Sequence, residues 1–419
     1  MKFLLGIAWK NLSRSKLRTL ISIVAIAVAV IAVNFGQSFI NGMVNNVFST
    51  QIKYNTGHVR IINEEYELQE RLLSLDYPVN GFDGQGIQAM QEKLNTIEGV
   101  EQVIPRLKFG AIATEKEELI RMMGWGIVPE EEITYTNIDE KITEGRMVES
   151  GKREIVVGAN LLEDLDHQVG EKITLVYNTS FGSFKGSTFK IVGKVDTSIE
   201  FLSDNVFYLP IDQAQEILDL PDQATEILLA TPNFREIDNY FPKIKQTVQQ
   251  ADTLGQYLAI PWNKGSVLIS LLEIALFFYN FFYIFIIFLA SFVLINTMYM
   301  IIKERTREIG MMTALGLRHR DILYLFLIEG SIIGVVGSLL GAIIGGFSIK
   351  WLSQIGIDFS EGLSGFSGDM MMEPIIYPSY SFNYIIISFL MGAIVVAITC
   401  IIPARRASQL EPTEALRHI

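Results

Sequence analysis

Hydrophobic residues in this chain are concentrated in four long runs, at roughly Leu17–Phe39, Leu268–Ile302, Ile322–Ile349 and Tyr384–Ile402. A helix that crosses the ~30 Å hydrocarbon core of a bilayer needs about 20 apolar residues. Each run has about that length or more, so the pattern predicts four transmembrane helices. Between the first two runs lies a long stretch of ordinary soluble composition, which is long enough to form hydrophobic cores of its own.

The stretch between the first two runs has the pattern of mixed α and β structure. Helical spacing predicts helices over Asp83–Ile97, with Asp83 as the cap, and over Ile211–Leu218 and Asn233–Gln250. Short apolar segments predict strands at Val100–Ile104, Leu107–Thr114, Leu119–Trp125, Glu154–Val157, Lys172–Tyr177, Thr188–Val195, Val206–Leu209 and Glu226–Ala230. The expected fold is an α-helical membrane protein with four transmembrane helices and a large mixed α/β extracytoplasmic domain inserted between helices 1 and 2.

Basic residues near the span ends predict the orientation, because Lys and Arg beside a span stay on the cytoplasmic side. They are abundant before the first run, in Lys303–Arg320 and in the tail, whereas the loop after the third run is acidic. We expect both termini in the cytoplasm and the large domain on the opposite side of the membrane. The formal net charge of −12 comes almost wholly from the α/β domain, which argues against nucleic acid as a partner.

The second run is too long for a single span, so we expect its N-terminal part, near Glu273, to leave the bilayer as a stalk. The first helix is expected to continue similarly toward Thr50. The expected segments are a cytoplasmic N-terminus (1–16), helix 1 with its stalk (17–50), the large extracytoplasmic domain (51–264), a stalk with helix 2 (265–302), a cytoplasmic coupling helix (303–320), helix 3 (321–350), a short extracytoplasmic loop (351–383), helix 4 (384–403) and a cytoplasmic tail (404–419).

The segment Lys303–Arg320 holds the first functional candidate. Ile309, Met311, Met312 and Leu315 recur at three- and four-residue spacings on a charged background, which predicts one apolar stripe on a short polar helix. Such a stripe is typical of a helix that docks into a groove on a soluble partner. The hypothesis is that a cytoplasmic motor protein attaches here.

Five glycines of the third run fall on one face of the predicted helix: Gly330, Gly334, Gly337, Gly341 and Gly345. Faces of small residues allow helices to approach one another closely in membranes. The sequence leaves open whether this face packs against the chain's own bundle or against a second membrane subunit.

The loop 178–187 is rich in Gly and Ser and contains Phe181 and Phe184. A flexible loop with two exposed aromatic rings is a candidate hook for a partner protein. The alternative, an ordinary hairpin tip whose rings fold back, stays equally open.

Motifs of nucleotide and metal chemistry are missing from the sequence. It holds no G-x-x-x-x-G-K-[ST] loop, so we expect no ATP binding or hydrolysis of the P-loop kind by this chain. The four histidines are too scattered for a zinc cluster. The acidic run Glu130, Glu131 and Glu132 is expected to be solvated. No catalytic residue, metal or cofactor is predicted in this chain.

Three motifs resemble one family. The blocks ERTREIGMMTALGLRHRDI, LIEGSIIGVVGSLLGAIIG and PARRASQLEPTEALR are similar to the permease module of MacB/FtsX-type ABC transporters, and NGMVNNVFSTQIKYNTGHVRI resembles the lipoprotein-release permeases of the LolC/LolE type. The resemblance implies a permease of the bacterial inner membrane whose large domain, of two subdomains, lies in the periplasm. It also implies a second permease subunit that is identical or homologous, and two copies of a separate ATP-binding subunit that binds ATP and Mg. The expected coupling set is Glu304, Arg305, Arg307, Glu308, Gly310, Met311, Met312, Leu315 and Gly316.

On this resemblance, ATP hydrolysis in the cytoplasm drives a shape change in the periplasm that extracts lipoproteins from the outer leaflet, with a periplasmic chaperone and membrane lipid as further partners. Acyl chains need an apolar cavity, and the candidates are Phe35, Phe39, Met43, Leu271, Ile274, Phe278 and Phe281. Plain lipid-facing or packing roles are the alternative for these residues. MacB-like export of peptides or drugs and FtsX-like regulation of a cell-wall hydrolase stay open as functions.

Overall fold

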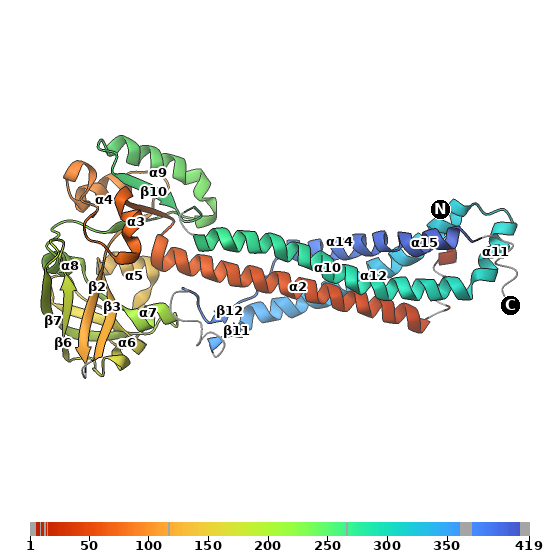
Figure 1. Cartoon of the computed structure of the whole chain (residues 1–419), viewed down its shortest axis with the longest axis horizontal. Coiled ribbons are helices and arrows are strands. Elements are labelled where there is room, and N and C mark those ends of the chain that lie inside the picture. The colour runs from red at the N-terminus through yellow and green to blue at the C-terminus, as the bar shows by residue number, and fades with distance from the viewer. Residues whose placement is uncertain are drawn as a thin grey trace. The chain divides into compact units, whose positions relative to one another are not determined.

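The computed structural model describes residues 6–8, 10–11, 14, 16–115, 118–264, 267–360 and 371–410. The chain forms two compact units, each of which is assembled from separate stretches of sequence. The helical unit comprises Met1–Asn45, Leu271–Asp358 and Ile375–Ile419, and the sheet unit comprises Asn46–Ser270 and Phe359–Pro374. Figure 1 labels the helices and strands of both units.

Four of the described helices are long and apolar enough to cross a membrane. They are α2 (Lys16–Gln51), α10 (Val267–Glu304), α12 (His319–Ile355) and α14 (Phe382–Thr399), the last followed by α15 (Ile401–Ser408). A long apolar segment folds as a helix because a helix bonds every backbone N–H and C=O within the segment, away from water. The predicted fold class is confirmed, with a mixed α/β domain between the first and second long helices.

The sheet unit is built on one sheet of ten strands in the order β10-β1-β9-β2-β3-β8-β5-β7-β4, with β6 paired to β2 and β7. Most neighbours are antiparallel, while β3–β8 and β5–β7 are parallel. The strands are β1 (Val59–Asn63), β2 (Gln102–Glu115), β3 (Glu118–Ile127), β4 (Ile142–Gly145), β5 (Glu154–Gly158), β6 (Lys172–Asn178), β7 (Phe184–Val195), β8 (Val206–Pro210), β9 (Glu226–Ala230) and β10 (Tyr257–Pro261).

Short helices connect and cover these strands. They are η1 (Ile52–Thr56), α3 (Glu64–Gln69), η2 (Glu70–Leu72), η3 (Phe82–Gly84), α4 (Ile87–Asn95), α5 (Pro129–Thr136), η4 (Ile138–Lys141), α6 (Ala159–Asp164), α7 (Glu200–Asn205), α8 (Ile211–Leu218), η5 (Phe234–Glu236) and α9 (Ile237–Ala251). In the helical unit, α11 (Thr306–Ala314) lies between α10 and α12, and β11 (Ile357–Asp358) pairs with β12 (Ile375–Ile376).

Alternation along the strands explains where the cores of the sheet unit lie. In β6 every second side chain, Ile173, Leu175 and Tyr177, is buried, as expected for a strand with one face toward a core. These residues pack with β2, β5, β7 and β8 under α6 and α8 in one core. A second core lies where α4 and α9 pack on β1 and β9.

Two local predictions were wrong. Asp83 does not cap a helix: it lies in η3 at φ +53°, and α4 begins only at Ile87 after Gly84 and Gly86 at positive φ. The predicted strands Val100–Ile104 and Leu107–Thr114 are one strand, β2. Its proline, Pro105, lies just before the point where β3 begins to pair with β2, so the missing N–H does not break the strand.

The loop 178–187 is a hairpin between β6 and β7, whose last pair is Asn178 with Phe184. Phe181 and Phe184 are 81% and 78% exposed, so their rings do not fold back onto the sheet. The sequence left two alternatives open, a loop that contacts a partner protein and a hairpin whose rings fold back. The structure shows a hairpin with exposed rings.

The glycine face of α12 packs against helices of the same chain. All five glycines are buried. A Cβ on Gly334 would lie 2.7 Å from Cγ1 of Val396 in α14, and one on Gly341 would lie 2.6 Å from the carbonyl oxygen of Ala27 in α2. Of the two partners that the sequence left open, the structure shows the chain's own bundle.

Replacing Gly341 by Val should therefore push α2 away from α12. We expect the variant to lose about 1–3 kcal/mol of stability, as overpacked sites do, and to unfold at lower temperature in detergent. The matched control is Ser348→Val, which enlarges a side chain on the exposed side of the same helix. Equal unfolding temperatures for the two variants would contradict close packing at Gly341.

Candidate coupling site and the joint at the end of α2

Helix α11 is set off from both of its neighbours by a break in the backbone. Arg305 stands between α10 and α11 with φ −104° and ψ 9°, outside the helical range. Its N–H donates to the carbonyls of Ile301 (3.0 Å) and Ile302 (3.2 Å). At the other end, Gly316 has φ +98°, which favours glycine. The segment expected to couple to a partner is thus a short, separate helix.

The two sides of α11 have different surroundings. Ile309 is fully buried among apolar residues of α10, α12 and α15, whereas Met311 is 47% and Leu315 85% exposed. Met312 is half-buried. The prediction of one outward apolar stripe was therefore wrong, because Ile309 holds α11 to the bundle while Leu315 faces solvent.

Charged residues at α11 contact the beginning of α2 and the residues before it. Glu304 pairs with Arg18 at 2.6 Å, and Glu308 pairs with Arg14 at 2.8 Å. Arg305 donates to Glu308 at 3.1 Å and also to Asn11. The Arg14 and Arg18 pairs are largely exposed and contribute little to stability, so they align α11 without fixing it firmly.

The opposite end of α2 belongs to the sheet unit, where polar groups bond its last turn. After Gln51 the helix continues as the π-helical turn η1. The last carbonyls of a helix have no partner within it. Here the Ile52 carbonyl accepts from the Gly57 N–H at 2.9 Å and also from the Tyr135 hydroxyl at 3.0 Å, and the Tyr54 carbonyl accepts from the Arg106 guanidinium. We call these carbonyls, with Arg106, Tyr135 and Glu132, the α2 joint.

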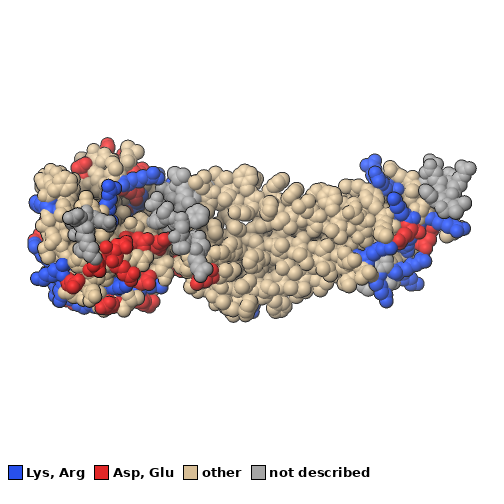
Figure 2. Space-filling model, turned by 60° about the horizontal axis from the view of Figure 1, so that its bottom comes forward, with Lys and Arg blue, Asp and Glu red and all other residues tan. Residues whose placement is uncertain are grey.

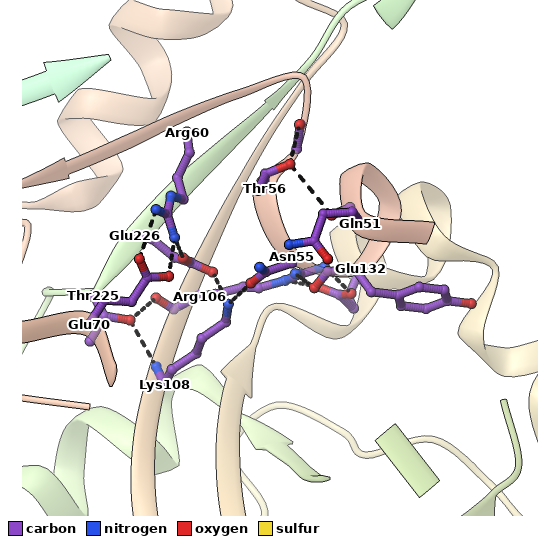
Figure 3. Close-up of polar contacts among 12 residues, drawn as sticks. Gln51, Asn55, Thr56, Arg60, Glu70, Arg106, Lys108, Glu132, Thr225 and Glu226 are labelled. Atoms are coloured by element: carbon purple, nitrogen blue, oxygen red, sulfur yellow. Dashed lines mark hydrogen bonds and ion pairs between the residues drawn. The ribbon is translucent and has the colours of Figure 1, made fainter. Parts of the chain in front are cut away.

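Arg106 is the centre of the α2 joint (Figure 3). It binds Glu132 through two bonds, Nε to Oε2 at 3.0 Å and Nη2 to Oε1 at 2.7 Å, and both side chains are fully buried. It also lies 5.0 Å from the centre of the Trp125 ring. Burial alone would lower the pKa of Arg106, but the Glu132 carboxylate keeps it above the ordinary value. The joint is therefore a charged pair that has no access to water.

The sequence of α5 explains how Glu132 reaches this position. Pro129 begins the helix, and three glutamates follow in its first turn, where the helix dipole favours negative charge. Glu130 faces solvent, whereas Glu132 points to Arg106 and is buried. The expectation of a solvated acidic run was wrong for Glu132.

A second buried ionic cluster lies beside the joint (Figure 3). Lys108 Nζ contacts Glu226 Oε1 at 2.8 Å and donates to Asn55 Oδ1 of η1 at 3.0 Å. Arg60 contacts Glu226 at 3.5 Å and donates to both oxygens of Glu70. Burial lowers the pKa of Lys108, and the carboxylate of Glu226 opposes this shift. Buried positive and negative groups thus compensate one another around the end of α2.

Metal and histidine chemistry does not account for these clusters. Among the described residues, no group of three or more His, Cys, Asp or Glu could hold a metal ion. His58 Nδ1 accepts from the Thr231 N–H at 2.9 Å, and burial lowers the pKa of His58 to about 4. His58 is therefore a neutral structural residue at pH 7.

Two family models match the chain. The MacB-like periplasmic core domain matches residues 19–246, more than half of the chain, and the FtsX-like permease C-terminal model matches residues 280–412. The chain belongs to the MacB/FtsX family of ABC transporter permeases. The resemblance seen in the sequence is confirmed.

Relatives of the permease point to the same family. It is 23% identical to the lipoprotein-releasing system transmembrane protein LolC of Xylella fastidiosa, over 75% of this chain and 78% of that protein. It is also 23% identical to an uncharacterized ABC transporter permease of Methanocaldococcus jannaschii, over 98% and 96% of the two chains. The macrolide export ATP-binding/permease protein MacB of Bdellovibrio bacteriovorus is 36% identical over 30% of this chain and 16% of its own length.

Among solved structures, the periplasmic region of MacB from Actinobacillus actinomycetemcomitans matches with a TM-score of 0.34 and 12% identity. The match covers 51% of this chain and 92% of that one. With four apolar helices and relatives that are permeases, this chain is a multi-pass inner-membrane protein; ABC transporter permeases such as its homologues work with ATP-binding subunits.

The residues predicted to form an apolar cavity of the permease are not brought together. On α2, Phe35 and Phe39 stack with ring centres 6.0 Å apart. On α10, Phe278 and Phe281 are 64% and 69% exposed, as Leu271 and Ile274 also are. The side of α10 that packs on α2 is instead that of Tyr283, whose ring lies beside Gly36.

Sequence reasoning missed the α2 joint. Its signal was the pair Arg106 and Lys108, two positions apart in an otherwise apolar strand pattern. Residues two apart point to the same face of a strand, so two cations on one buried face require acidic partners. The sequence does not say which carboxylates these are.

Removing the positive charge of the α2 joint should greatly lower the stability of the protein. Arg106→Gln should lower the free energy of unfolding by about 3–5 kcal/mol, because Glu132 is left buried without a partner. The double variant Arg106→Gln, Glu132→Gln should recover part of that loss. Chemical denaturation measures both, with the half-exposed Arg146→Gln as the control. An equally small effect for Arg106→Gln and Arg146→Gln would contradict the buried pair.

Proposed function

We propose that this permease takes up movement from a separate ATP-binding subunit at α11 and transmits it through α2 to a periplasmic sheet domain, so that lipoproteins are released from the outer leaflet of the membrane. The ATP-binding subunit, present in two copies, holds ATP and Mg. The observation that carries the proposal is the α2 joint, where the end of a membrane helix is bonded directly to the core of the sheet domain.

The position of α11 supports docking from the cytoplasm. Leu315 is 85% exposed at the end of a short helix whose Ile309 is buried in the bundle and whose Met312 also packs against it. Lys and Arg gather around this end of the helical unit, next to an apolar helix surface (Figure 2). Basic residues beside spans stay in the cytoplasm, so both termini belong there and the sheet domain belongs in the periplasm.

The α2 joint supports transmission rather than simple anchoring. A helix whose last carbonyls are bonded to Arg106 and Tyr135 does not shift independently of the strand and helix that carry these two side chains. Movement of α2 along or about its axis therefore reaches β2 and α5 without first being lost in a flexible loop.

The LolC relatives and the apolar surface of α10 support a lipid-linked cargo. A groove of about 350 Å³ lies between α10 and α14 and is lined by Phe281, Ile284, Phe285, Phe288, Val395, Ile398 and Thr399. Each CH₂ of an acyl chain that leaves the bilayer costs about 0.8 kcal/mol, and an apolar groove offsets that cost. A second permease subunit, identical or homologous, would enclose the exposed phenylalanines of α10 opposite those of α2.

Release also requires an acceptor for the extracted lipoprotein. The β6–β7 hairpin presents Phe181 and Phe184 to solvent in the domain that we place in the periplasm. Exposed aromatic rings on a rigid hairpin are suited to protein contact, and we assign them to a periplasmic chaperone. An adaptor and an outer-membrane channel bound there would instead favour MacB-like export, and a hydrolase would favour FtsX-like regulation.

Docking at α11 is tested by Leu315→Asp. The charge should prevent burial of this position against the ATP-binding subunit, so we expect that subunit to be lost when the permease is purified from its own membranes. Leu254→Asp, at a 66% exposed leucine of the sheet unit, is the control. If Leu315→Asp retains the ATP-binding subunit as fully as Leu254→Asp does, α11 is not the docking helix.

The acyl groove is tested by Phe281→Ala. Loss of a phenylalanine contact worth about 1.5–3 kcal/mol should lower the rate of ATP-dependent release of a diacylated lipoprotein from proteoliposomes by about tenfold or more. Phe347→Ala, at a 73% exposed position of α12, should release at the parental rate. Parental release by both variants would remove α10 from the cargo pathway.

A further inference from the structure

One carboxylate, Glu329, is buried inside the helical unit beside Arg305 and Asn11. The Glu329 side chain, on α12, is 3% exposed, and neither of its oxygens accepts a hydrogen bond from the part of the chain that the structure describes. Arg305 Nη1 lies 3.9 Å from Glu329 Oε1, which is longer than the ~2.7–2.9 Å of a bond between charged groups. Charged residues inside a membrane bundle are costly and mark functional positions.

The guanidinium of Arg305 is shared among three elements. Its Nε donates to Glu308 of α11 and its Nη2 to Asn11 near the N-terminus. Its Nη1 is the atom that approaches Glu329 of α12. An arginine fork binds a carboxylate best through two parallel N–H bonds, and here the fork is divided instead.

If the Arg305 guanidinium moved closer to Glu329, the partners that it leaves, Glu308 and Asn11, would lose little interaction energy. Glu308 keeps a second cation, since Arg14 contacts it at 2.8 Å. Asn11 is uncharged, so it loses one hydrogen bond and no ion pair. A shift of about 1 Å brings the guanidinium to bonding distance, and Arg305 stands at the backbone break between α10 and α11.

We infer that Arg305 and Glu329 form a two-position latch between α11 and α12. In the position described here, Asn11 and Glu308 hold the guanidinium; in the other, the guanidinium binds the Glu329 carboxylate and ties α11 to the buried side of α12. The inference rests on the proposed function, because it takes α11 as the helix on which the ATP-binding subunit acts. Any displacement of α11 moves Arg305 first, so the two residues position the helix and convert docking into a defined state of the bundle.

The test uses the permease with the ATP-binding subunit that purifies with it, reconstituted in nanodiscs. Ser49→Cys, at an exposed position of α2, is the reporter, since the native Cys400 is buried. The rate of maleimide labelling is measured with and without ATP, beside ATP hydrolysis. For Glu329→Gln, added to the reporter chain, we expect a bound ATP-binding subunit and continued hydrolysis, while the ATP-dependent change in labelling falls about tenfold.

The controls separate a latch from a merely structural carboxylate. Ser338→Ala removes another buried polar atom of α12 and should label as the reporter chain does. In a double-mutant cycle, Arg305→Gln with Glu329→Gln should lose no more than Glu329→Gln alone, because the two residues act through each other. The latch is refuted by additive losses, by unchanged ATP-dependent labelling in Glu329→Gln, or by loss of the ATP-binding subunit from that variant. Absence of ATP-dependent labelling in the reporter chain itself would refute the proposed function, and the latch with it.

Discussion

A guanidinium with no access to water holds the end of α2 to the sheet domain. Arg106 is fully buried, and its N–H groups are divided between the Glu132 carboxylate and the last carbonyls of η1. Burying such a charge costs several kcal/mol, and the cost is recovered only while every partner stays in place. The geometry of the joint is therefore all-or-none: the helix end, the strand β2 and the helix α5 keep their places together or lose them together.

Within the helical unit, α2 is held by close packing against α12 and not by buried charge. The glycines of α12 remove side chains from the contact, so that the Ala27 carbonyl of α2 comes within 2.6 Å of a Cβ position on Gly341. Close contact over a long face gives many small dispersion gains and keeps α2 next to α12. One helix is thus fixed by backbone proximity along one part of its length and by buried charge at its end.

Much of the fold could be predicted because it depends on patterns that are local. The four apolar runs became the four long helices, and β6 and α8 have the bounds that alternation and helical spacing indicated, within a residue. The failures were of another kind. Whether Ile309 or Leu315 faces outward depends on which side of α11 the bundle covers, and the burial of Glu132 depends on Arg106, which is 26 residues away in sequence. Asp83 does not cap a helix because two glycines with positive φ follow it, and the helix begins only after them. Spacing within a segment carries no information on any of these contacts between segments.

Ion pairs are exposed around α11 and buried at the α2 joint. This difference suits a permease in which α11 moves and the joint keeps its geometry. Around α11, the pairs of Arg14 and Arg18 are open to water, so rearranging them costs little. At the α2 joint, the pair of Arg106 is closed to water and rearranging it is expensive. A push on α11 therefore rearranges its exposed ion pairs and the long contact to Glu329 first, and α2 passes the movement on while the joint stays intact. If instead the ion pairs of α11 were buried and the pair of Arg106 were exposed to water, the same push would separate α2 from the sheet. The movement would then not reach the sheet.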